Sequence, residues 1–242
     1  MSIFSKKDVL LTWRLCFSVV LAALVCVFAM VLFLPEKVWA GEMPTSIAVQ
    51  DELNEEDFKE ANEELIQIGR NAKRLRTVFT VSMTKFLQTD SAWSNDIMAV
   101  DNETIGVSGC YLTSFAMVAN YYFPNAGYNP KTINVLMGIY ACPFYREIAA
   151  TRTDLEIYNY LSGNPIDTSV MTDLIAGAIV MERPVIVGMI KANGQTHYVV
   201  ARGYSTTTGE IYIFDPGSST INTLSAYTNL GGRVTEILVY GR

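Results

Sequence analysis

Three residues far apart in the chain have side chains that together could carry out nucleophilic catalysis. Cys110 stands between a small Gly-Val-Ser-Gly loop and an apolar run, His197 is the only histidine, and Asp215 precedes a Pro-Gly pair. A cysteine attacks as its thiolate, a form that both a helix N-terminus and a neighbouring imidazolium favour. A carboxylate that hydrogen-bonds the imidazole fixes its tautomer and stabilises its charge. The three residues are therefore a candidate nucleophile, general base and orienting group.

Strand pairing predicts that the histidine and the carboxylate are neighbours. The runs 197–204 and 210–216 are rich in β-branched and aromatic residues and flank a polar loop. A hairpin folded about Thr206 sets His197 directly opposite Asp215, on the same face of the sheet. A slip of one residue would separate the two side chains.

Each of the three residues also has a non-catalytic alternative. A lone strand histidine is often a structural residue tied to a nearby acid, and Asp before Pro-Gly is an ordinary opener of a turn. Cys110 and Cys142 are the only cysteines beyond residue 40, and outside the cytoplasm the two could form a disulfide. These alternatives stay open at the level of sequence.

Residues 1–40 have the features of a signal peptide or a membrane anchor. Residues 15–34 form an uncharged apolar run of a length that spans a bilayer. Basic residues precede the run, which predicts a cytoplasmic N-terminus, and Ala40 could precede a signal-peptidase cut. We expect either a cleaved signal or a retained single-span anchor. Both place residues 41–242 outside the cytoplasm, secreted or anchored to the cell membrane.

The acidic linker 41–76 contains a predicted amphipathic helix over residues 51–76. Acidic residues crowd the start of this helix and basic residues its end, which suits the helix dipole. We expect a solvated helix without chemistry of its own, and roles as a spacer, a docking helix or a pro-segment stay open. Its apolar residues recur at steps of three and four and are Phe58, Ala61, Leu65, Ile68, Ala72 and Leu75.

The remaining elements predict an α+β domain over residues 77–242. Helices come first and an antiparallel sheet second, which is the α+β order. Pro124 ends the first helix. The predicted helices are 110–123, a short one opened by Asn129-Pro130, and 169–181. The predicted strands are 77–83, 184–190, 197–204, 210–216 and 233–240.

Composition excludes several classes of function. Half of the residues are hydrophobic, enough for a sizeable core. The net charge is −6 and the basic excess is confined to the first forty residues, whereas nucleic-acid binding needs a basic face. One histidine and scattered cysteines do not make a zinc site of the usual kind. We therefore expect no nucleic-acid partner, no metal and no cofactor.

Five stretches together carry a resemblance to a known family. They are FLQTDSAW (86–93), SGCYLTSFAMVANYY (108–122), RPVIVGM (183–189), HYVVARGY (197–204) and IYIFDPGS (211–218). In these stretches, and in the order Gln, Cys, His, Asp, the chain resembles the papain-like cysteine peptidases, most closely the group related to bacteriocin double-glycine leader peptidases. The resemblance covers about residues 78–240.

The resemblance implies a papain-like fold, in which a helical lobe carrying the Cys packs on a β-sheet lobe carrying the His and Asp. It implies Cys110 as nucleophile, His197 as general base and Asp215 as orienting group. Gln88 would donate a hydrogen bond to the oxyanion, together with the backbone N–H of Cys110. Many relatives have Gly after the cysteine, whereas this chain has Tyr111.

We therefore expect an exported or membrane-anchored cysteine peptidase-like hydrolase. It would cleave a bond in a peptide or protein substrate through a thioester. One alternative is an amidase or acyl transferase on the same scaffold, because a triad does not fix the leaving group or the acceptor. The other is a papain-like fold kept as a non-catalytic binding module, with Cys110 bonded to Cys142.

Overall fold

The computed structural model describes residues 54–99 and 102–242. The predicted signal or anchor segment, residues 1–40, lies outside the described residues. Within the described ranges, no helix combines the length and the apolar character needed to cross a membrane.

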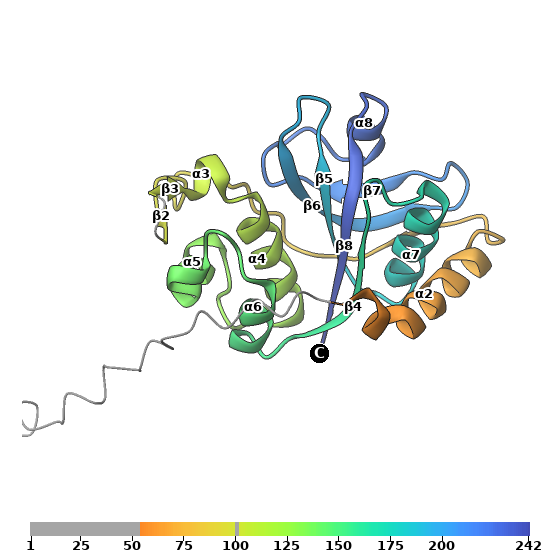
Figure 1. The fold of residues 1–242 in the computed structure, drawn as a ribbon, viewed down its shortest axis with the longest axis horizontal. Helices are drawn as coiled ribbons and strands as arrows, with labels where there is room; N and C mark the ends of the chain where they lie inside the picture. Colours follow the sequence, from red (N-terminus) through yellow and green to blue (C-terminus); the bar gives the residue numbers. More distant parts are fainter. Residues whose placement is uncertain (1–53, 100–101) are drawn as a thin grey trace, which may run out of the picture. The chain divides into compact units, whose positions relative to one another are not determined.

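A six-stranded antiparallel sheet stands at the centre of the described structure (Figure 1). The strand order is β1-β6-β5-β8-β4, and β7 also pairs with β6. Five strands, β1 and β5 to β8, match predicted runs. The edge strand β4 was not predicted, and a β-bulge interrupts its pairing with β8. The bounds are β1 Val78–Thr80, β4 Glu156–Ser162, β5 Val185–Ile190, β6 Thr196–Ser205, β7 Ile211–Phe214 and β8 Arg233–Gly241.

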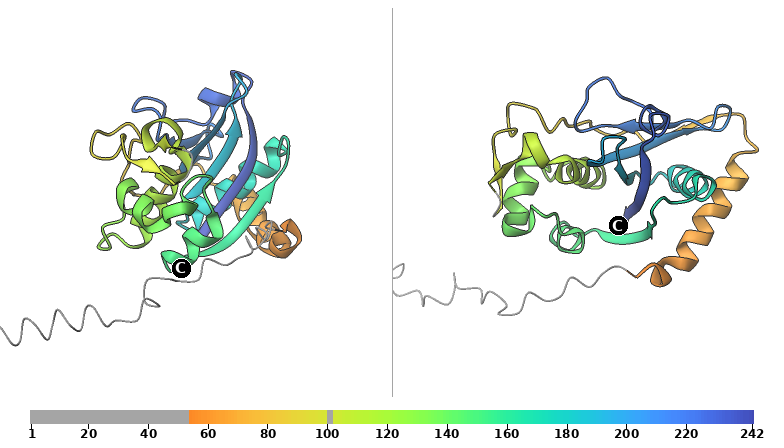
Figure 2. Two further views of the ribbon diagram at one scale, coloured as in Figure 1. Left: turned by 60° about the vertical axis from the view of Figure 1, so that its left-hand side comes forward. Right: turned by 45° about the horizontal axis from the view of Figure 1, so that its top comes forward.

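Helices cover both faces of the sheet, so the described residues have two hydrophobic cores (Figures 1 and 2). On one face, α7 (Thr168–Val180) packs over Val187 and its neighbours. On the other, α4 (Cys110–Tyr122) packs over Ile186 and its neighbours. Successive strand residues point to opposite faces. A strand covered on both faces therefore has a continuous apolar run, as β5 has in VIVGMI.

Short elements complete the fold. The predicted helix start at Asn129 is confirmed, because its side chain accepts a hydrogen bond from the backbone N–H of Thr132. Pro124 follows the end of α4, as predicted. The remaining elements are β2 Ile97–Met98, β3 Glu103–Thr104, α3 Ile105–Ser108, α5 Pro130–Met137, η3 Gly138–Tyr140, α6 Arg146–Arg152 and α8 Ser225–Thr228.

The predicted N-terminal helix is present, but it is not a solvated rod. A short helix, η2 (Glu55–Phe58), precedes α2 (Lys59–Ala72). Leu65 is fully buried, and α2 lies along α7 in Figure 1. The side chain of Asn62 donates to the carbonyl of Tyr160 at 3.0 Å, so α2 also satisfies part of the open edge of β4. The expectation of a solvated helix is therefore corrected.

Two glycines let α2 and α7 approach closely. A Cβ at Gly69 would lie 1.9 Å from the carbonyl oxygen of Asp173, and one at Gly177 would lie 1.9 Å from that of Leu65. No side chain tolerates such distances, so both positions need glycine. The buried carboxylate of Asp173 also accepts a hydrogen bond from Nε of Arg70 at 3.1 Å. The helix pair is thus held by close backbone contact and by an ion pair.

The substitution Gly177→Ala tests this helix contact, because two effects oppose each other. Helix propensity alone favours Ala over Gly by about 1 kcal/mol. The contact with Leu65 predicts the opposite, a loss of roughly 1–3 kcal/mol from overpacking. Denaturant unfolding measures whether the substitution raises or lowers the free energy of unfolding. Asn71→Ala, at an exposed position of α2, is the matched control and should change stability by less than about 0.5 kcal/mol. A stabilised Gly177→Ala protein would contradict the contact.

Candidate active site

The structure brings Cys110, His197 and Asp215 together. Nε2 of His197 lies 2.9 Å from Oδ1 of Asp215, and the imidazole also has a hydrogen bond with Cys110. Because Nε2 faces the carboxylate, Nδ1 is the ring nitrogen left for the sulfur. The three side chains come from the first residue of α4, the second residue of β6 and the residue after β7.

The hairpin that links His197 to Asp215 has a different register from the predicted one. Ala201 pairs with Ile213, whereas the prediction set Ala201 opposite Ile211. Backbone hydrogen bonds from Ser205 to Glu210 and from Gly209 to Ser205 close the loop. A β-bulge lies on β6 between Ala201 and Gly203. Beyond the bulge the register shift is three residues, so Gly203 and Tyr204 lie on the face opposite to the predicted one. Between the site and Ala201 the register shift is two residues, which leaves those side chains on their predicted faces. The imidazole and the carboxylate therefore still meet, as diagonal neighbours.

Asp215 is a fully buried carboxylate with three hydrogen-bond donors. Besides His197, the backbone N–H of Gly217 donates to Oδ1 at 2.7 Å, and the hydroxyl of Tyr227 donates to Oδ2. Burial by itself raises the pKa of Asp215, but the hydrogen bonds from His197 and Tyr227 outweigh it, so the pKa lies below its ordinary value. The carboxylate is therefore charged where it faces the imidazole.

His197 is held in its charged form at neutral pH. Burial lowers the pKa of the imidazole, but the hydrogen bonds with Asp215 and Cys110 raise it more, to about 9. A protonated imidazole beside a sulfur is the environment that favours a thiolate. The geometry thus places the sulfur of Cys110 beside a charged imidazole that a carboxylate supports.

Cys110 is not joined to Cys142 by a disulfide in the described residues. The nucleophile position instead depends on Gly109, whose N–H donates to the carbonyl of Ile105 at 2.9 Å. A Cβ at Gly109 would lie 2.5 Å from that same oxygen. A side chain at residue 109 would therefore push the start of α4, and the sulfur with it, away from α3.

Gln88, the predicted oxyanion donor, lies near the histidine and the carboxylate. It is 7% exposed, and its backbone N–H donates to the carbonyl of Pro216 at 2.8 Å. A Cβ at Gly217 would lie 3.4 Å from Cε1 of His197 and 3.8 Å from Oε1 of Gln88. Nε2 donates to the carbonyl of Gly106 at 2.9 Å, which leaves one side-chain N–H for an oxyanion. That role stays a prediction.

Tyr227 is a residue of this site that the sequence analysis missed. It lies on α8, where its hydroxyl donates to Asp215 and its ring centroid is 5.5 Å from that of His197. Burial and the hydrogen bond to Asp215 raise its pKa, so the hydroxyl stays a donor. The four-residue helix SAYT has no motif and no periodicity that could have indicated this contact.

Comparison with known protein families shows which family the chain belongs to. The family model described as Peptidase_C39 like family matches residues 87–233, which is more than half of the sequence. The chain belongs to the Peptidase_C39-like family. The α+β, papain-like fold class predicted from the sequence is confirmed, and the protein is peptidase-like. The match includes Gln88, Cys110, His197 and Asp215. No curated protein and no solved structure matches the chain.

The single histidine of this Peptidase_C39-like protein makes its titration directly measurable. We expect the proton NMR signal of the imidazole Cε1–H to titrate with a pKa of about 9. Asp215→Asn should lower that pKa, because it removes the carboxylate charge that favours the imidazolium. An imidazole that titrates near 6.5 in the wild-type protein would contradict the site geometry.

The same shift predicts how stability depends on pH. Since the pKa of His197 is about 9 in the folded protein and about 6.5 unfolded, protonation stabilises the fold fully below pH ~6.5. That contribution is lost as the pH rises through about 9. The unfolding free energy of the wild-type protein should therefore fall over this window relative to His197→Gln. Parallel urea titrations at several pH values measure the difference, and a constant difference would contradict the shift.

Proposed function

We propose that this protein is an exported or membrane-anchored cysteine peptidase that cleaves a peptide or amide bond. One observation carries the proposal: the imidazole of His197 is hydrogen-bonded both to the sulfur of Cys110 and to the buried carboxylate of Asp215. The family match supports peptidase chemistry at this site. The apolar run 15–34 supports export or anchoring.

Each residue has one role in the first half of the reaction. Sγ of Cys110 attacks the carbonyl carbon of the scissile bond, and the carbonyl electron pair moves to the oxygen. The imidazolium of His197 then gives its proton to the leaving amine, and the carbon–nitrogen bond breaks. The products are a free amine and a thioester on Cys110. Asp215 keeps Nδ1 of the ring directed at the sulfur throughout.

Hydrolysis of the thioester reverses these roles. The neutral imidazole takes a proton from water, and the oxygen of that water attacks the thioester carbon. Collapse of the tetrahedral intermediate breaks the carbon–sulfur bond and releases a carboxylic acid. The thiolate of Cys110 and the imidazolium of His197 are restored. The backbone N–H of Cys110 and the side chain of Gln88 are the proposed donors to the oxyanion of both intermediates.

The substrate class that follows is a peptide or protein met outside the cytoplasm. The competing binding-module hypothesis relied on a disulfide between Cys110 and Cys142, which is absent from the described residues. A thiol in contact with an imidazole is instead available to react.

Labelling with iodoacetamide near neutral pH, without reductant, tests the proposal. We expect fast labelling at Cys110, located by peptide mass mapping, because the imidazolium favours the thiolate. His197→Ala should abolish the fast phase, and Cys142→Ala, the matched control, should keep it. On peptide libraries, Cys110→Ala should abolish cleavage while the melting temperature stays nearly unchanged. Slow labelling of Cys110 that is indifferent to His197→Ala would refute the catalytic pair.

A further inference from the structure

The residues that directly follow Cys110 and His197 stack on each other. Tyr111 and Tyr198 have ring centroids 4.2 Å apart and planes inclined by 28°. Tyr111 also stacks with Phe144, at 4.7 Å and 27°. These rings come from α4, from β6 and from the segment that precedes α6. One aromatic column therefore joins the helix of the sulfur to the strand of the imidazole.

The sheet holds Tyr198 in a defined place. Gly188 of β5 pairs with Tyr198 on one side and with Glu236 of β8 on the other. A Cβ at Gly188 would lie 2.7 Å from Cε1 of Tyr198, so the ring passes over β5 only because residue 188 is glycine. Beyond it, the hydroxyl of Tyr198 donates to Oε2 of Glu236 at 3.1 Å. The ring thus bridges β6 and β8.

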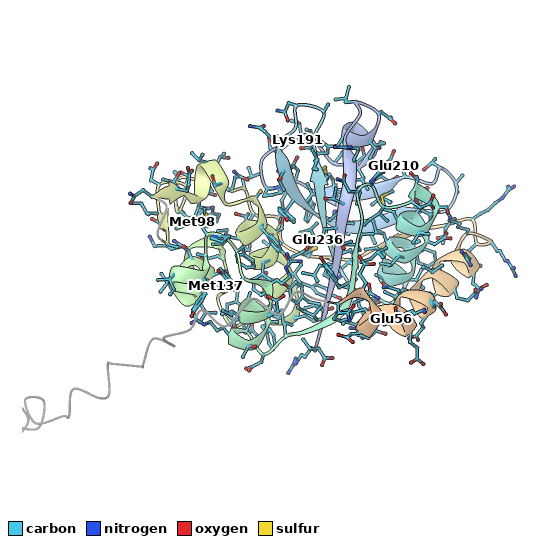
Figure 3. All side chains as sticks on the ribbon, viewed as in Figure 1. Glu56, Met98, Met137, Lys191, Glu210 and Glu236 are labelled. Atoms are coloured by element: carbon cyan, nitrogen blue, oxygen red, sulfur yellow. The ribbon has the colours of Figure 1, made fainter. Side chains whose placement is uncertain are left out.

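A buried ion pair fixes the far end of this bridge. Glu236, which Figure 3 labels near the middle of the molecule, pairs with Nη1 of Arg146, the first residue of α6. The two side chains are only 12% and 18% exposed. Buried charges that lose a partner are strongly unfavourable, so the pair resists displacement. The contacts run without a break from α6 through the sheet to α4.

The column joins the two elements that carry the reacting residues, α4 and β6. Cys110 belongs to a helix layer and His197 to the sheet, and nothing covalent near the site joins them. Each tyrosine follows its reacting residue directly, and neighbouring Cα atoms are about 3.8 Å apart. A change in the ring contact therefore moves the sulfur relative to the imidazole.

We propose that Tyr111 and Tyr198 are positioning residues that set the separation between Sγ of Cys110 and the imidazole of His197. This role rests on the proposed function of the Cys–His pair and deepens it. Neither tyrosine takes part in bond making. Their stack supplies the registry between helix and sheet, and a displacement of about 1 Å at a reacting pair can cost on the order of 100-fold in rate.

The single histidine provides a readout that a general loss of stability does not move. The hydrogen bond with Cys110 contributes to the raised pKa of His197, and the other groups that face the ring are Asp215 and Tyr227. Tyr111→Leu should therefore lower the NMR-measured pKa of the imidazole toward the value found in Cys110→Ala. In the Cys110→Ala background, the same substitution should cause no further change.

Matched variants separate positioning from packing. Met117→Ala removes a fully buried side chain from the same helix, and it should destabilise the fold while leaving the pKa of His197 unchanged. Tyr198→Phe keeps the stacked ring, so most of the upward shift in the pKa of His197 should remain. Gly188→Ala displaces the ring of Tyr198 from the sheet side and should lower the pKa as Tyr111→Leu does, so it serves if Tyr111→Leu does not fold. Iodoacetamide labelling of Cys110 should slow by about tenfold or more in both variants.

The outcomes distinguish this proposal from the proposed function. A wild-type pKa and labelling rate in Tyr111→Leu and Gly188→Ala, with a lowered pKa in Cys110→Ala, would overturn the positioning role and leave the peptidase proposal standing. An equal shift in the Cys110→Ala background would also overturn it, because the tyrosine would then act on the ring without the sulfur. If Cys110→Ala left the pKa of His197 unchanged, the contact between Cys110 and His197 would be contradicted, and both proposals would fail.

Discussion

The hydrogen bond between His197 and the buried carboxylate of Asp215 is the interaction on which the rest of this structure depends. A charge fully removed from water is strongly unfavourable unless hydrogen bonds compensate for it. Here the imidazole, a backbone N–H and the hydroxyl of Tyr227 all donate to the one carboxylate. These donors keep Asp215 ionised, and the ionised carboxylate in turn keeps the imidazole charged and oriented toward Cys110.

The sheet is arranged around the strand that carries the histidine. β6 pairs with β5, β7 and β1, so the backbone of His197 belongs to the most extensively paired strand of the described sheet. The sulfur has a different support, the close packing of Gly109 against Ile105 at the start of α4. Two rigid supports on separate layers need a connection. The stacked rings of Tyr111 and Tyr198 are one direct contact between them, and the hydroxyl of Ser114 on α4 also donates to the backbone carbonyl of Tyr198 at 3.3 Å.

Close helix packing stabilises the second face of the sheet. α7 covers that face and α2 covers α7, through glycine contacts that leave no room for side chains. Glu55 accepts hydrogen bonds from Ser162, and Asn62 donates to Tyr160, so the N-terminal helices also cover the edge of β4. An open strand edge invites pairing with other chains. The segment that sequence periodicity described as a solvated helix is therefore part of the packed domain.

Local patterns in the sequence by themselves determined the helices of residues 110–123 and 169–181, the four main strands and the α+β class, because apolar periodicity and turn residues act over short distances. They also placed the imidazole and the carboxylate on one face, since an even register shift preserves faces. Tertiary structure alone decided the register itself, the contact of Tyr227 with Asp215, the burial of α2 and the column from Tyr111 to Arg146. Each of these depends on residues distant along the chain, whose meeting is settled by the packing of whole layers and leaves no periodic signal in the sequence.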